Sequence, residues 1–150
     1  MNANGSTILL VEDNPDDVLL IRRAFQKAGI GNPVVAVEHG DEAVAYLDGT
    51  GAYADRQRYP IPALVLLDLK LPRRSGLEVL GWVRQHEGLK RLPIVVLTSS
   101  RDEGDINKAY DLGANSYLVK PVAFDELLRL VRSVEGYWLM LNERPDVTAA

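Results

Sequence analysis

Four short apolar runs in this chain each end in side chains that can carry out chemistry. The runs and the residues that follow them are 8–11 with Glu12 and Asp13, 64–67 with Asp68, 94–97 with Thr98, and 116–119 with Lys120. Parallel strands place their carboxyl ends at one edge of a sheet, which is where open α/β sheets hold their sites. We therefore expect three carboxylates, one hydroxyl and one ammonium group to meet at such an edge.

Three clustered carboxylates are costly unless a cation compensates their charge. Oxygen ligands without His or Cys favour a hard ion, and a site that keeps open positions for water and phosphate favours Mg²⁺ over Ca²⁺. Such an ion would screen the acids so that Asp68 can attack a phosphoryl group. Thr98 and Lys120 would contact the other phosphoryl oxygens. The residues thus predict an aspartyl-phosphate site.

The segments between and beyond the apolar runs predict the elements that position this site. Asn14 suits a helix N-cap and Pro15 the first helical position. Apolar residues then recur at helical spacing up to Gly29. Together with a strand at 33–37, the pattern gives five strands alternating with five helices, which predicts an α/β fold with a five-stranded parallel sheet covered on both faces. The helices after the first are expected near 42–47, 77–86, 102–112 and 124–141.

The chain of 150 residues has room for one domain with a substantial core. We expect a disordered leader at 1–6, the domain at 7–142 and a tail at 143–150. Within the domain, 49–62 shows no period and predicts an extended loop. The final helix is expected to be long, from about 124 to 141.

Composition excludes several classes of protein. The net charge of −4 and the lack of a dense Lys/Arg cluster argue against nucleic-acid binding. The chain has no cysteine, which rules out disulfides and thiolate metal sites. We expect no signal peptide and no membrane span, and therefore a cytoplasmic protein.

The chain resembles the receiver domain of two-component response regulators, with a doubly wound (βα)5 flavodoxin-like fold. The resemblance spans about 7–134 and is carried by four motifs: Leu10-Val11-Glu12-Asp13-Asn14, Leu67-Asp68-Leu69-Lys70-Leu71-Pro72 with Ser75-Gly76, Val96-Leu97-Thr98-Ser99, and Tyr117-Leu118-Val119-Lys120-Pro121. It implies a signalling protein rather than an enzyme, which accepts a phosphoryl group from a sensor histidine kinase in a Mg²⁺-dependent reaction and then changes its partner binding.

The resemblance also implies a role for each site residue. Asp68 is the phosphoacceptor, and Thr98 and Lys120 contact the phosphoryl group. The ligands of Mg²⁺ come from the acidic pair and the acceptor strand, namely Glu12, Asp13, Asp68 and the backbone carbonyl of Lys70. Tyr117 matches an aromatic switch position whose ring turns inward when Thr98 is drawn toward the phosphoryl group, although a tyrosine in a strand is also common as plain core. A cis bond is expected between Lys120 and Pro121.

More narrowly, the chain is similar to small single-domain regulators that partner phytochrome-type sensor kinases. This similarity rests on the stretch 11–17, the loop 49–62 and Tyr137-Trp138-Leu139. The final helix is apolar around most of its girth, which predicts a homodimer through this helix and its neighbours. Packing of Tyr137 and Trp138 within the chain is the alternative.

Other functions are compatible with parts of the pattern. The receiver could serve as a phosphorelay shuttle, as a phosphate sink or as a binding-only pseudo-receiver, although the intact acid set disfavours the last. A flavodoxin-like cofactor binder is disfavoured because the acids after the first strand would repel a cofactor phosphate. A phosphohydrolase would differ by cycling on a supplied phosphoester.

Overall fold

The computed structural model describes residues 5–149 and contains one five-stranded parallel sheet with strand order β2-β1-β3-β4-β5. This architecture confirms the predicted fold class. The elements in chain order are β1 Ile8–Val11, α1 Pro15–Lys27, β2 Val34–Val37, α2 Gly40–Asp48, the 3₁₀ turn η2 Gly51–Tyr53, β3 Leu64–Leu67, α3 Gly76–Gln85, β4 Ile94–Thr98, α4 Glu103–Asp111, β5 Ser116–Val119, α5 Phe124–Val134 and the π-helical η3 Glu135–Leu141.

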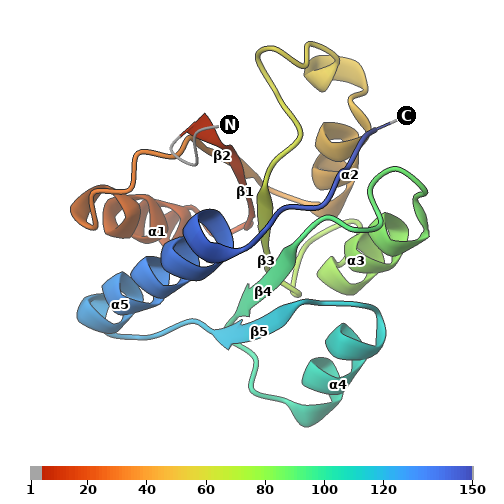
Figure 1. The fold of residues 1–150 in the computed structure, drawn as a ribbon. Coiled ribbons are helices and arrows are strands. Elements are labelled where there is room, and N and C mark those ends of the chain that lie inside the picture. The colour runs from red at the N-terminus through yellow and green to blue at the C-terminus, as the bar shows by residue number, and fades with distance from the viewer. Residues whose placement is uncertain (1–4, 150) are drawn as a thin grey trace.

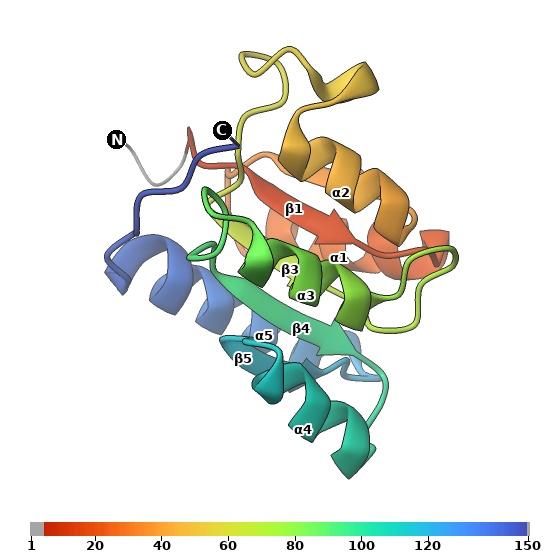
Figure 2. The same cartoon turned by 90° about the vertical axis from the view of Figure 1, so that its right-hand side faces the viewer.

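Two layers of helices cover the sheet (Figures 1 and 2). Helices α1 and α5 lie on one face, and α2, α3 and α4 lie on the other. Successive strand residues point to opposite faces. Leu9 and Val11 accordingly join the core beneath α2 and α3, whereas Ile8 and Leu10 join the core beneath α1 and α5. The central strands β1, β3 and β4 are therefore buried on both sides, as their unbroken apolar runs predict, whereas the edge strands β2 and β5 are only partly buried.

Strand register brings the chemical residues to one edge. Val11 pairs with Val37 on one side and with Leu67 on the other. Thr98 at the end of β4 pairs with Val119 at the end of β5. The residues that follow β1, β3 and β5 therefore emerge at the same edge as Thr98.

The final helical segment has the predicted length but not a uniform geometry. It is α-helical to Val134 and π-helical from Glu135 to Leu141. Much of its apolar surface is covered by other parts of the chain, because Leu128, Val134 and Leu139 are buried. Three large apolar side chains of η3 remain exposed, namely Tyr137, Met140 and Leu141.

The predicted loop at 49–62 is ordered around an arginine and three tyrosines. Arg56 donates hydrogen bonds of 2.7 Å to the carbonyl of Tyr46 and 2.6 Å to that of Leu47, at the end of α2. The Tyr53 ring centroid lies 5.0 Å from the centroids of both Tyr46 and Tyr59. The guanidinium thus donates to two carbonyls in the last turn of α2 and ties the loop to the end of that helix.

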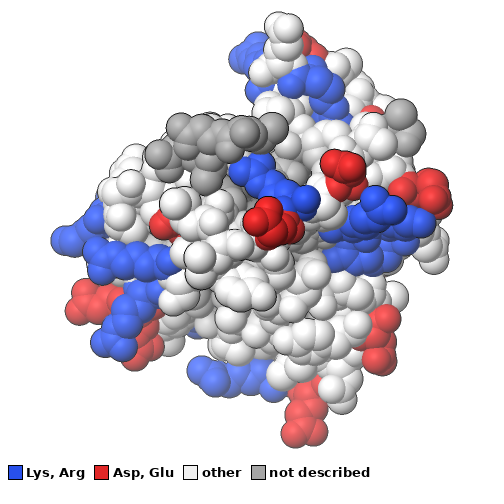
Figure 3. All heavy atoms as spheres, in the orientation of Figure 1, with Lys and Arg blue, Asp and Glu red and all other residues white. Residues whose placement is uncertain are grey.

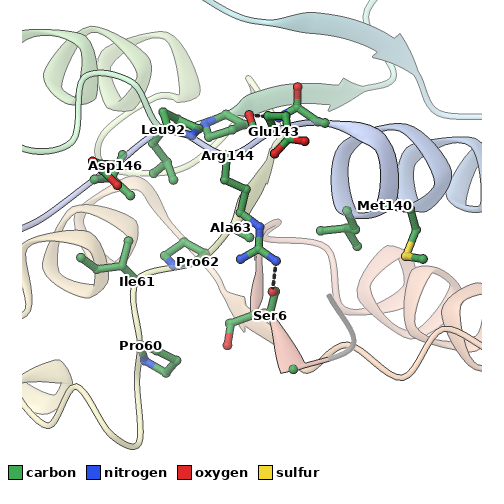
Figure 4. A pocket seen from close by; sticks show the side chains of 17 residues that line it. Ser6, Pro60, Ile61, Pro62, Ala63, Leu92, Met140, Glu143, Arg144 and Asp146 are labelled. Atoms are coloured by element: carbon green, nitrogen blue, oxygen red, sulfur yellow. Dashed lines mark hydrogen bonds between the residues drawn. The ribbon is translucent and has the colours of Figure 1, made fainter. Parts of the chain in front are cut away.

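Both flanks of the described chain pack at the edge of the sheet opposite the chemical residues. Arg144 donates a hydrogen bond to the hydroxyl of Ser6, and the amide of Thr148 donates one of 2.8 Å to the carbonyl of Gly88. A hollow of about 890 Å³ lies beside Arg144, with Pro60, Pro62 and Met140 among its lining residues (Figure 4). Residues 1–4 of the predicted leader lie outside the described residues, whereas Ser6 is buried.

Charged side chains of both signs are interspersed over the face that Figure 3 presents. Within residues 5–149, no helix is both long and apolar enough to cross a membrane.

Candidate functional site

The three predicted carboxylates meet at the carboxyl ends of β1 and β3. One oxygen from each of Glu12, Asp13 and Asp68 lies within 4.8 Å of the other two. The backbone holds them there, because the amide of Glu12 donates to the carbonyl of Val37 at 3.0 Å and the amide of Asp68 donates to that of Val11 at 3.1 Å. Glu12 and Asp68 are buried, whereas Asp13 is exposed.

Lys120 reaches into this cluster from the end of β5. Its Nζ lies 3.0 Å from Oδ2 of Asp68 and 3.0 Å from Oδ2 of Asp17, and it also donates to Oε1 of Glu12. The side chain is 14% exposed. One partly buried ammonium group therefore pairs with three carboxylates.

Burial and these contacts shift the acid–base properties of the pair at the centre. Burial raises the pKa of Glu12 to about 7, although hydrogen bonds from Lys120 and from the Asn14 amide oppose the shift. Burial lowers the pKa of Lys120, but its hydrogen bonds to Glu12, Asp17 and Asp68 outweigh that effect and leave the pKa above its usual value. Lys120 is thus firmly cationic, and Glu12 holds its negative charge less readily than an exposed glutamate.

Thr98 contacts the other carboxylate oxygen of Asp68, and Tyr117 lies on the strand next to Thr98. The Thr98 hydroxyl donates a 2.7 Å hydrogen bond to Oδ1 of Asp68, and Thr98 is fully buried. The half-buried Tyr117 packs against the core beneath α2, α3 and α4 and donates a 3.0 Å hydrogen bond from its hydroxyl to the carbonyl of Ser100. The hydroxyl that contacts the acceptor and the aromatic ring thus lie on adjacent strands, with the ring partly packed against the core.

Lys70 follows the acceptor but directs its ammonium group elsewhere. Its amide donates to Oδ1 of Asp68 at 3.3 Å, whereas its Nζ lies 3.5 Å from Oδ2 of Asp105 in α4. Ser100 donates to the same Asp105 oxygen at 2.7 Å. This small polar network links the loop after β3 to the start of α4.

The prediction of a cis bond between Lys120 and Pro121 is wrong, because no cis peptide bond occurs within residues 5–149. The trans form is the favoured state of an X–Pro bond. Lys120 reaches all three carboxylates with the bond in this form.

The donor set fits a small divalent cation. Glu12, Asp13 and Asp68 offer only carboxylate oxygens, which suit a hard ion such as Mg²⁺. The exposure of Asp13 leaves one side of the cluster open to water or to a phosphoryl oxygen. The carbonyl of Lys70 remains a predicted ligand.

Asp17 is a member of the site that the sequence pattern did not predict. It was not among the predicted site residues, yet its side chain pairs with Lys120. The available signal was the position of an acid in the first turn of the helix that follows Glu12 and Asp13. That turn begins next to the site, so an acid in it can reach the lysine.

Comparison with known proteins agrees with this geometry. Residues 8–132 match the family model described as the response regulator receiver domain. The chain is 40% identical over 141 residues to the probable methanogenesis regulatory protein FilR2 of Methanothrix harundinacea, covering 92% of this chain and 86% of FilR2. It is 39% identical over 132 residues to the response regulator Rcp1 of Synechocystis sp., covering 88% of each chain.

Solved structures give the same picture. The phosphorylated cyanobacterial phytochrome response regulator RcpA superposes with a TM-score of 0.87 at 40% identity, covering 95% of this chain and 99% of RcpA. The Mn²⁺-bound form of Rcp1 superposes with a TM-score of 0.83 at 37% identity, covering 93% of this chain and 99% of Rcp1. This chain therefore belongs to the response regulator receiver domain family.

Proposed function

We propose that Asp68 of this receiver accepts a phosphoryl group from a sensor histidine kinase. The observation that carries the proposal is the meeting of the Asp68 carboxylate with Lys120, Thr98 and the two acids after β1 at one sheet edge. Asp68 is the only one of the three acids that also contacts the threonine hydroxyl. It is therefore the carboxylate with donors placed for the oxygens of an incoming group.

The transfer forms one bond and breaks another. A carboxylate oxygen of Asp68 bonds to phosphorus, the bond from phosphorus to the donor nitrogen breaks, and the imidazole leaves with that electron pair and takes up a proton. A divalent ion held by Glu12, Asp13 and Asp68, and by the carbonyl of Lys70, would neutralise charge on the transferring oxygens. Lys120 stabilises a phosphoryl oxygen by charge, and Thr98 donates a hydrogen bond to another.

Intact-mass measurement tests the acceptor. Wild type incubated with acetyl phosphate and Mg²⁺ should gain the mass of one phosphoryl group, and chelation of the ion should abolish the gain. Asp68→Asn should gain none, whereas Asp111→Asn, a matched change at an exposed acid on α4, should behave as wild type. Equal labelling of Asp68→Asn and wild type would reject the assignment.

The phosphorylated form should differ in partner binding through Thr98 and Tyr117. Thr98 contacts the acceptor, and Tyr117 lies on the adjacent strand β5, opposite Val96, with its hydroxyl on the Ser100 carbonyl. A phosphoryl group that recruits the Thr98 hydroxyl would shift the positions of Thr98 and Tyr117. It would also shift α4, which is loosely held because it buries only Ala109 among its own residues. The surface formed by α4, β5 and α5 is therefore the proposed readout.

We propose a phytochrome-type kinase as the phosphodonor. The support is the similarity to RcpA and Rcp1, together with exposed apolar side chains near the site residues in sequence. Leu19 and Leu20 of α1 and Val122 after Lys120 are exposed. They lie close in sequence to Asp17 and Lys120, which form an ion pair.

Competitive phosphotransfer from a phytochrome-type kinase and from an unrelated histidine kinase tests the partner. Faster labelling by the unrelated kinase would reject it, and onward transfer to a second protein would identify a relay role rather than a phosphate sink.

We propose a homodimer in which η3 contributes the apolar contact. Tyr137 is 58% exposed and Leu141 is 77% exposed. Trp138 and Leu130 pack against the chain's own core, so they are poor positions for a test. Sedimentation should show a monomer for Tyr137→Glu combined with Leu141→Glu, and an unchanged dimer for Leu19→Glu. A wild-type monomer, or a dimer that survives both η3 changes, would place the interface elsewhere.

We propose that the receiver unit spans 7–142, between the leader 1–6 and the tail 143–150. The contacts of Ser6 and Thr148 with the rest of the chain indicate that deletion of either flank would lower stability.

A further inference from the structure

Asp17 is the third carboxylate partner of Lys120 and the most accessible. Its side chain is 33% exposed, compared with 2% for Glu12 and 7% for Asp68. The carboxylate approaches the lysine from α1, whereas Glu12 and Asp68 approach it from the ends of β1 and β3. The ammonium group therefore lies between the sheet edge and the first turn of α1.

The first turn of α1 is held in place by a short chain of hydrogen bonds. The side-chain oxygen of Asn14 accepts from the amide of Asp16 at 2.9 Å and from that of Asp17 at 3.3 Å. The amide of Asn14 in turn donates to Oε2 of Glu12 at 3.1 Å. Asp17 is thus fixed relative to the buried acid and not only to its own helix.

The three partners of Lys120 differ in whether a cation competes for them. Glu12 and Asp68 belong to the oxygen set that fits a divalent ion, and Asp17 does not. Ion binding and phosphorylation would therefore draw Glu12 and Asp68 away from the ammonium group. Asp17 is the one carboxylate of the three that remains available to Lys120 throughout.

We propose that Asp17 is a positioning residue that retains Lys120 on the α1 side of the site while the cation and the phosphoryl group engage Glu12 and Asp68. This inference rests on the proposed function. Without Asp17, the ammonium group pairs only with carboxylates that the ion needs, so the ion must displace it. Loss of Asp17 therefore weakens ion binding through Lys120, beyond the loss of one nearby negative charge.

Calorimetric titration with Mg²⁺ provides a readout that does not depend on phosphorylation. Asp16 is a matched control because it lies in the same helical turn, is exposed and makes no contact with Lys120. Asp17→Asn should raise the Mg²⁺ dissociation constant about threefold more than Asp16→Asn, in keeping with a partly exposed ion pair. Asp17→Glu should restore part of the loss. Equal effects of Asp17→Asn and Asp16→Asn would overturn the proposal.

A double-mutant cycle separates the route through Lys120 from a direct effect of charge. In a Lys120→Gln background, the excess effect of Asp17→Asn should vanish, and its persistence would overturn the proposal. A second measurement needs only the single variants: the acetylation rate of Lys120 at saturating Mg²⁺, followed by peptide mass. Asp17→Asn should raise this rate relative to Asp16→Asn, and an unchanged rate would also overturn the proposal.

Failure of the proposed function has a different signature. In that case wild type itself would neither bind Mg²⁺ nor accept a phosphoryl group on Asp68. If wild type binds Mg²⁺ and is phosphorylated on Asp68, but Asp17→Asn and Asp16→Asn raise the Mg²⁺ dissociation constant equally, only the role of Asp17 is rejected.

Discussion

The hydroxyl of Thr98 donates a 2.7 Å hydrogen bond to the carboxylate of Asp68 from the end of the neighbouring strand. Thr98 is fully buried, and removal of its hydroxyl would leave Oδ1 of Asp68 with the longer, 3.3 Å hydrogen bond from the Lys70 amide. Register between β3 and β4 fixes the pair, since Leu67 lies opposite Val96, two residues before Thr98. The orientation of the acceptor is thus set by the strand beside it.

Replacement of Thr98 by valine keeps the shape of the side chain and removes the hydroxyl. We expect Thr98→Val to lower the free energy of unfolding by about 2 kcal/mol, because the Asp68 carboxylate loses the shortest of its hydrogen bonds. Phosphorylation of Asp68 should also slow. Thr98→Ser retains the hydroxyl and should phosphorylate faster than Thr98→Val. Urea denaturation and mass measurement check both, and equal rates would contradict the role of the hydroxyl.

Removal of the Lys120 charge should make stability dependent on Mg²⁺. In Lys120→Gln, Glu12 and Asp68 lose their cation, which should cost about 3 kcal/mol when the ion is chelated. Saturating Mg²⁺ binds the folded state and should recover much of this loss. Thermal unfolding with and without Mg²⁺ measures the difference. Lys90→Gln is the control, because Lys90 pairs only with the exposed Glu87 at the surface. A Lys120→Gln deficit that Mg²⁺ leaves unchanged would show that the ion does not compensate these acids.

Gly76 should tolerate no side chain. A Cβ at this position would lie 2.1 Å from the carbonyl oxygen of Asp68, so the loop after the acceptor would have to move. We expect Gly76→Ala to destabilise the fold by about 2 kcal/mol and to slow phosphorylation. Gly31→Ala, where the added Cβ meets nothing within 4 Å, should stay within about 0.5 kcal/mol of wild type. Urea denaturation decides, and similar midpoints for the two variants would contradict the close approach.

The tyrosine cluster around 46–59 predicts a loss of stability in alkali. Burial, and then the hydrogen bond to Glu42, raises the pKa of Tyr53 above its usual 10.0, and burial raises that of Tyr46. The folded state therefore retains protons that the unfolded state releases above about pH 10. The contribution of these two tyrosines to the free energy of unfolding is therefore full below about pH 10 and declines as pH rises through their folded-state pKa values.

Urea denaturation at pH 8 and pH 11 tests this sign. Tyr53→Phe should lose about 1 kcal/mol at pH 8, because its 2.6 Å hydrogen bond to Glu42 is gone. Between pH 8 and pH 11, the free energy of unfolding of Tyr53→Phe should then fall by less than that of wild type. Tyr137→Phe, at an exposed position, should follow wild type at both values. A wild-type stability that does not fall by pH 11 would refute the prediction.

Strand positions and the main site residues could be predicted because short-range signals determine them. Unbroken apolar runs identify buried strands, and parallel pairing then brings Asp13, Asp68 and Lys120 to one edge. The Asn14 cap and Pro15 likewise mark the start of α1, where both lie as expected.

The remaining features depend on contacts between distant segments. The pairing of Asp17 with Lys120 joins residues 103 positions apart, and no local pattern distinguishes Asp17 from Asp16. The order of the 49–62 loop comes from Arg56, whose partners lie at the end of another helix. The apolar girth of the last helix predicted a wide second surface, but α1 and the sheet occupy most of it.

The contact between Arg144 and Ser6 has a practical consequence for handling the molecule. Both flanks leave from the edge where the strands begin, and the acceptor lies where they end (Figures 1 and 2). The span from Ser6 to Glu12 along β1 is about 20 Å. A fluorophore, affinity handle or surface linker joined near either flank would leave the phosphodonor's approach to Asp68 unobstructed.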